Sequence, residues 1–83
     1  MNANEFDCFR RLQFELSRRG WESEAISLEV CMQRASGRDE RMRLAGKWLM
    51  VFRGEHAALC ERALAPAVAD CVAEIQATWP EFR

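Results

Sequence analysis

The sequence predicts an all-α protein: a small antiparallel four-helix bundle forming one domain over residues 1–83. Glycines at positions 20, 37 and 54 divide the chain into segments of roughly three to four helical turns, and glycine is favoured just past a helix end. β-branched residues are few, and no Asn-Gly or Asp-Gly pair of the kind that closes a hairpin is present. Apolar side chains recur at three- and four-residue spacing along the whole chain, which is typical of amphipathic helices.

The first helix is expected from Asn4, which can cap it, to Arg19. One face of its helical wheel is apolar and carries Cys8, Phe9, Leu12 and Leu16. A second stripe alternates aromatic rings with guanidinium groups that can stack on them: Phe6, Arg10, Phe14 and Arg18. Phe14 does not fit the core face. Either the last helix or Phe82 covers it, or it anchors a partner with Arg10 and Arg18 as a polar rim.

The second helix is expected over residues 21–35 and is apolar on two sides. One face carries Trp21, Ala25, Leu28 and Met32. Ile26 and Val30 lie nearly opposite that face. Such a helix is expected to lie between its own bundle and a second chain, which predicts a homodimer with this helix and the outer side of the first helix in the interface.

The third helix, over residues 38–53, is expected to be the most buried. Apolar side chains cover about half of its wheel: Met42, Leu44, Ala45, Trp48, Leu49, Val51 and Phe52. Met50 falls on the open side. Ser36, followed three residues later by Asp39, approximates a capping box at the helix start.

The last helix is expected over residues 55–79, and it contains Pro66. Its apolar stripe stays in register through the proline: Ala57, Cys60, Leu64, Val68, Cys71, Ile75 and Trp79. Because Pro66 lies almost opposite this stripe, the preferred interpretation is one long helix kinked at Pro66. The alternative is a fifth helix that begins with Pro66 in its first turn.

The residues that could carry chemistry do not form a recognisable catalytic or metal site. Four cysteines fall among apolar neighbours without a Cys-x-x-Cys pair, so we expect reduced, buried, structural thiols. His56 and Cys60 are one helical turn apart but lack the further ligands of a metal site. No phosphate-binding glycine loop is present, and no serine has a visible base. We therefore expect no enzyme activity, no metal and no cofactor.

Charge and hydropathy narrow the remaining classes of function. The net charge is −1, although eleven of the twelve basic residues are arginines and most of them lie in the front half. A small nucleic-acid-binding regulator that uses the arginines of the first helix is the alternative function, weakened by the acidic residues that offset them. No apolar run is long enough to span a membrane, and the first residues do not resemble a signal peptide, which predicts a cytoplasmic protein.

Protein binding is the preferred function, because the chain has more large apolar side chains than one small core accommodates. The surplus comprises Phe14, Ile26, Val30, Met50 and Phe82. The predicted partner-binding residues are Phe6, Arg10, Phe14, Arg18, Ile26, Val30 and Met50. In size, helical character and arginine and alanine content, the chain resembles small accessory proteins of bacteria and phages that bind and silence a host protein. That resemblance implies a stoichiometric inhibitor or anti-activator and assigns no role to a single residue.

Overall fold

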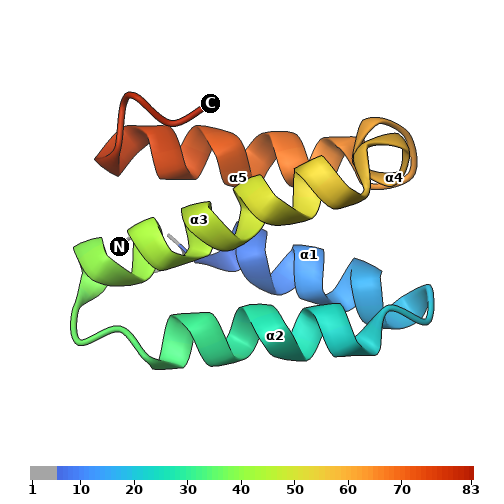
Figure 1. Cartoon of the computed structure of the whole chain (residues 1–83), viewed down its shortest axis with the longest axis horizontal. Helices are drawn as coiled ribbons and strands as arrows, with labels where there is room; N and C mark the ends of the chain where they lie inside the picture. The colour runs from blue at the N-terminus through green and yellow to red at the C-terminus, as the bar shows by residue number, and fades with distance from the viewer. Residues whose placement is uncertain (1–5) are drawn as a thin grey trace.

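The computed structural model describes residues 6–83, and these form five helices without a strand (Figure 1). The helices are α1 (Asp7–Arg18), α2 (Glu22–Gln33), α3 (Arg38–Glu55), α4 (Ala57–Glu61) and α5 (Ala65–Thr78). Four of them are substantial and α4 has only five residues. The predicted all-α class and the bundle of four main helices are confirmed.

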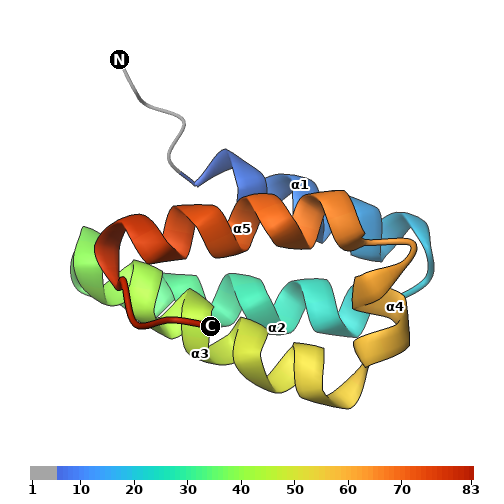
Figure 2. The same cartoon turned by 90° about the horizontal axis from the view of Figure 1, so that it is seen from above.

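The four main helices form a square in which each one packs on two others. α1 packs against α2 and α5, and α3 packs against the same two helices from the opposite corner. The two views agree on this arrangement, and the short α4 crosses the end of the bundle between α3 and α5 (Figures 1 and 2). Consequently α1 and α3 lie on a diagonal, and a residue on the outer side of one is remote from the outer side of the other.

A tight turn at Gly20 makes α1 and α2 antiparallel neighbours. Gly20 has φ +87°, a conformation that side-chain-bearing residues rarely adopt. The N–H groups of Gly20 and Trp21 donate to the carbonyls of Ser17 and Leu16, which satisfies the end of α1. The predicted stop at this glycine is therefore confirmed by its backbone geometry.

The preferred interpretation of Pro66 as a kink in one long helix is wrong. Residues 62–64 form a turn, and α5 begins afresh with Pro66 in its first turn, as the alternative predicted. A proline there has no N–H to leave unpaired, whereas inside a continuous helix it would remove one backbone bond and clash with the preceding turn. The N–H groups of Arg62 and Leu64 both donate to the Leu59 carbonyl, and Leu64 turns into the core.

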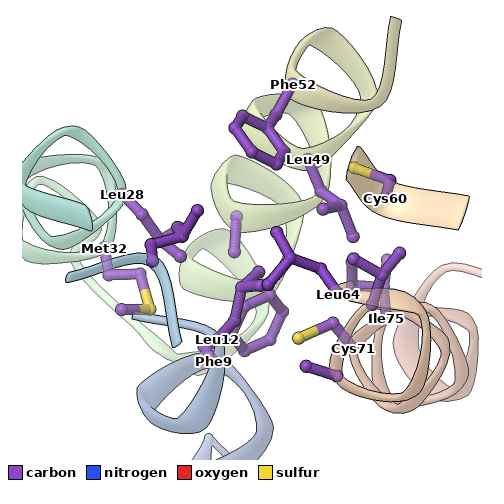
Figure 3. Close-up of a cluster of buried hydrophobic side chains, with 14 of the residues drawn as sticks. Phe9, Leu12, Leu28, Met32, Leu49, Phe52, Cys60, Leu64, Cys71 and Ile75 are labelled. Atoms are coloured by element: carbon purple, nitrogen blue, oxygen red, sulfur yellow. The ribbon is translucent and has the colours of Figure 1, made fainter. Parts of the chain in front are cut away.

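The core fills the space between all five helices. Its members include Phe9 and Leu12 from α1, Leu28 and Met32 from α2, and Leu49 and Phe52 from α3, together with Cys60, Leu64, Cys71 and Ile75 (Figure 3). The packing is made of apolar side chains alone, because no charged or polar residue among those described is buried. Hydrophobic burial is therefore the main source of stability.

The burial of two residues differs from the prediction. Phe82 was expected to be surplus, but it is only 1% exposed. Its ring packs 5.4 Å from that of Trp79 and under the Arg53 guanidinium, and its carbonyl accepts a hydrogen bond from Gln76. Val51 was expected in the core, but it is 60% exposed. The face of α3 that contacts neighbouring helices covers less than half of the circumference of the helix. Val51 lies outside that face and points into solvent.

The helix starts differ in detail from the predictions. The predicted Asn4 cap lies outside the described residues. At α3, Glu40 rather than Asp39 pairs with Ser36, and its carboxylate accepts bonds from the Ser36 hydroxyl at 2.7 Å and the Ser36 N–H at 3.1 Å. The carboxylate thus sits one residue later than a capping box requires.

Gly46 and Gly54 offer a matched test of packing within α3. A Cβ at Gly46 would meet Ile75, Trp79 and Phe82 side chains at 3.2–3.4 Å, whereas one at Gly54 would meet nothing within 4 Å. We expect Gly46→Val to lower the free energy of unfolding by about 1–3 kcal/mol through overpacking. Gly54→Ala is expected to raise it by about 0.5–1 kcal/mol through helix propensity. Thermal denaturation of both variants checks this; a stabilised Gly46→Val would contradict the close packing.

Candidate protein-binding surface

Three large apolar side chains on two neighbouring helices are exposed on one side of the bundle. Phe14 of α1 is 62% exposed, and Ile26 and Val30 of α2 are 57% and 47% exposed. Gln13 fixes how these helices face each other, because its amide donates to the Ala25 carbonyl at 3.2 Å and to Glu29 Oε1 at 3.0 Å. Phe14, Ile26 and Val30 directly follow the contact residues Gln13, Ala25 and Glu29 in the sequence. Because consecutive side chains point in different directions around a helix, all three lie on the outside of the α1–α2 pair and not in the contact between the helices.

We call the outer surface formed by Phe14, Ile26 and Val30 the α1–α2 face. Its existence answers the question that the sequence left open about Phe14. Neither α5 nor Phe82 covers this ring, since Phe82 packs on α3. Phe14 is therefore exposed in the monomer.

The aromatic and arginine stripe of α1 does not form a continuous stack. Phe6 is half-buried, its ring lies 6.1 Å from that of Phe9, and the guanidinium over it belongs to Arg41 of α3, at 5.2 Å. Phe6 and Arg10 line a hollow of about 190 Å³ with Glu29, Met32, Gln33 and Arg41. Phe6 is thus partly a packing residue, while Arg10 stands exposed at the edge of this hollow and one turn from Phe14.

Met50 does not join the α1–α2 face, although it is as exposed as Val30. It lies on α3, diagonal to α1. Val51, also exposed on α3, lines a separate hollow of about 250 Å³ between α2 and α3 with Trp48, Phe52, Glu24, Ser27 and Glu55. The predicted partner-binding residues are therefore not contiguous. Six of them lie on or beside α1 and α2, and the seventh, Met50, lies apart on α3.

Most arginines of α1 are paired with carboxylates of the same chain. Arg11 contacts Asp70 of α5 at 2.6 Å. Arg18 lies 3.4 Å from Glu15, and Arg19 donates to the same carboxylate. Arg10 is left without an ion pair among the described residues. Since paired guanidinium groups have less to gain from a phosphate, these contacts weaken the nucleic-acid alternative.

Glu15 links two of these arginines and gives the ion pairs a pH dependence. The hydrogen bond from Arg19 lowers the pKa of Glu15 below its ordinary value of 4.5. Because the pKa of Glu15 is lowered in the folded state, its ionised carboxylate stabilises the fold at pH values above the pKa of the unfolded state. This stabilisation is lost as the pH falls through the folded-state pKa.

Glu15→Gln is therefore expected to flatten the acid limb of the stability curve. Between about pH 5 and pH 3, its melting temperature should fall less than that of the wild type. Glu22→Gln removes an exposed carboxylate that has no ion pair among the described residues, and it is the control. Melting curves across this pH range check the effect, and equal slopes for Glu15→Gln and wild type would contradict it.

Sequence inspection missed an aromatic cluster at one end of α3. The His56 ring lies 4.7 Å from that of Trp21 and 4.9 Å from that of Phe52, and Trp48 stacks on Phe52 at 4.9 Å. The four-residue spacing of Trp48, Phe52 and His56 was the available signal. His56 packs here, and the described residues hold no group of three or more His, Cys, Asp or Glu side chains that could bind a metal ion.

The four cysteines differ more in exposure than the sequence suggested. All are free thiols. Cys60 and Cys71 are buried as expected, whereas Cys8 and Cys31 are only half-buried. Burial raises the pKa of Cys60, which makes that thiol a packing group.

The chain matched no protein-family model, no curated protein and no solved structure. None of the helices in residues 6–83 is both long and apolar enough to cross a membrane.

Proposed function

We propose that the protein is a small regulator or inhibitor that binds another protein through the α1–α2 face and masks the surface it covers. The observation that supports this most is the exposure of Phe14, Ile26 and Val30 on one side of two adjacent helices. Clustered apolar side chains of this size on a small protein are typical of a binding surface. Phenylalanine in the centre with arginine at the edge is also a composition enriched at interfaces.

The chemistry of the face indicates what the partner presents. Phe14 requires an apolar recess, because burying an aromatic ring supplies most of the affinity at such contacts. Arg10 and Arg18 lie one turn to either side of Phe14, and Arg18 is already close to Glu15. Arg10 has no ion pair within residues 6–83 and therefore favours a partner with an acidic group beside the recess. Inhibition would be steric and would need one molecule of this protein for each site masked.

Affinity capture from the native host with matched variants tests the proposal. Wild type and Met50→Ser are expected to retain the same protein, since Met50 lies outside the face. Phe14→Ser should lose it, because removing an interface anchor costs about 2 kcal/mol, or roughly 30-fold in affinity. If Phe14→Ser retains that protein as well as wild type does, the face is not its binding site.

Self-association through the same face is the second part of the proposal. A two-fold interface uses one patch twice, so Phe14, Ile26 and Val30 would be covered on both copies. In light scattering at high concentration, the expected mass is about twice the 9.6 kDa of the chain. A second copy and a target would then compete for one surface, so target binding should dissociate the homodimer. A mass of 9.6 kDa at all concentrations would exclude self-association.

A further inference from the structure

Two cysteines that are far apart in the sequence meet between α1 and α5. Cys8 of α1 packs against the buried cluster that contains Cys71 of α5, and it lies beside Asp70 and Glu74, the neighbours of Cys71 on that helix. Figure 3 shows the Cys71 sulfur pointing from α5 toward Phe9 and Leu12 of α1. Both thiols are free, so the two cysteines form a reduced dithiol pair.

The two sulfurs differ in their access to solvent. Cys8 is half-buried and lines an open hollow of about 680 Å³ on the outside of the α1–α5 pair. The hollow is lined by charged side chains of both signs: Asp7, Arg10, Arg11, Asp70 and Glu74. Cys71 is fully buried and does not line this hollow. A small oxidant in the hollow therefore reaches the Cys8 sulfur before that of Cys71.

The electrostatics of the pair favour the same order. The side-chain interaction with Cys71 lowers the pKa of Cys8, against the opposing effects of burial and of Glu74 and Asp70. The same interaction, together with burial, raises the pKa of Cys71. At a given pH, Cys8 therefore has a larger thiolate fraction than Cys71, and the thiolate is the reactive form of cysteine.

We propose that Cys8 and Cys71 form a reversible disulfide that ties α1 to α5 when the protein meets a peroxide. Cys8 attacks one peroxide oxygen, the O–O bond breaks, and the product is a sulfenic acid on Cys8 with release of water. The sulfur of Cys71 then attacks the Cys8 sulfur, the S–O bond breaks, and a second water leaves with the Cys71 proton. Two thiols and one hydrogen peroxide thus become one disulfide and two waters.

The other two cysteines do not share this arrangement. Cys31 lies on α2, which packs on α1 and α3, and Cys60 lies on α4 with a pKa raised by burial. The α1–α5 contact is also distinct from the α1–α2 face, so this proposal does not depend on the proposed binding function.

Peptide mapping of the folded full chain tests the disulfide. Trypsin leaves each cysteine in its own peptide, with Cys8 in residues 1–10 and Cys71 in residues 63–83. After hydrogen peroxide treatment and alkylation of the remaining thiols, we expect these two peptides to be linked and to separate with dithiothreitol. The peptides of Cys31 and Cys60 should be alkylated as in untreated protein.

Variants and stability complete the test. Cys31→Ser should form the same linkage as wild type. Cys71→Ala removes the resolving sulfur, so Cys8 should accumulate as a sulfenic acid that dimedone traps. Since the bond closes a long loop in the unfolded chain, oxidised wild type should melt at a higher temperature than reduced wild type. Failure of wild type to link the two peptides, or first modification of Cys31, would overturn the proposal without bearing on the α1–α2 face.

Discussion

Phe9→Ala is expected to destabilise the protein by about 3–5 kcal/mol, whereas Phe14→Ala should leave its melting temperature within a few degrees of wild type. Both residues lie on α1 and lose the same atoms in the substitution. Phe9 is completely buried in the core, however, and Phe14 is 62% exposed. Removing Phe9 loses its burial energy and leaves a cavity, while removing Phe14 from a solvated surface does neither.

The stability of a domain of this size makes the contrast easy to measure. Small domains unfold with about 5–15 kcal/mol, so the loss of Phe9 removes a large share and could unfold the chain at physiological temperature. Circular dichroism during heating or urea titration measures both variants. A Phe14→Ala variant that unfolds would mean that Phe14 packs inside the molecule, and Ile26 and Val30 would remain as the candidate binding residues.

The same Phe14→Ala change is expected to weaken the homodimer by about 1,000-fold. Phe14 occurs once on each copy, so a two-fold interface loses the anchor twice. At about 2 kcal/mol for each copy, the dissociation free energy falls by about 4 kcal/mol. Sedimentation equilibrium measures the dissociation constants, with Met50→Ala as the control that keeps the wild-type value. An unchanged constant for Phe14→Ala would place any dimer contact elsewhere on the molecule.

Helix positions were largely predictable because they depend on local signals. The apolar spacing and the stop at Gly20 predicted the first three helices to within a few residues. Gly54, predicted to end the third helix, instead lies inside α3. The break before Pro66 was not distinguishable from a kink by periodicity. The apolar stripe of residues 57–79 keeps its register in both cases, and only the backbone of residues 62–64 differs.

Whether an individual large apolar side chain is buried or exposed depends on contacts between helices, and a helical wheel does not describe these contacts. Phe14 and Phe82 looked alike in sequence, yet Phe82 follows the end of α5 and folds back onto α3. It lies beside Gly46, where the missing side chain leaves space for it. The wheel gave the outward direction of Ile26, Val30 and Met50 correctly. It could not show that α1 and α3 lie on a diagonal, which separates Met50 from the others.

Site-specific photocrosslinking tests most directly whether a protein covers the α1–α2 face. A benzophenone analogue of phenylalanine would replace Phe14, Ile26 or, as a control on α3, Val51, which is similarly exposed at 60%. On irradiation in extract of the native host, positions 14 and 26 are expected to yield an adduct with the same protein, either a target or a second copy. Position 51 should not yield it. Absence of an adduct at 14 and 26, or an equal yield of the same adduct at 51, would contradict the α1–α2 face as the binding surface.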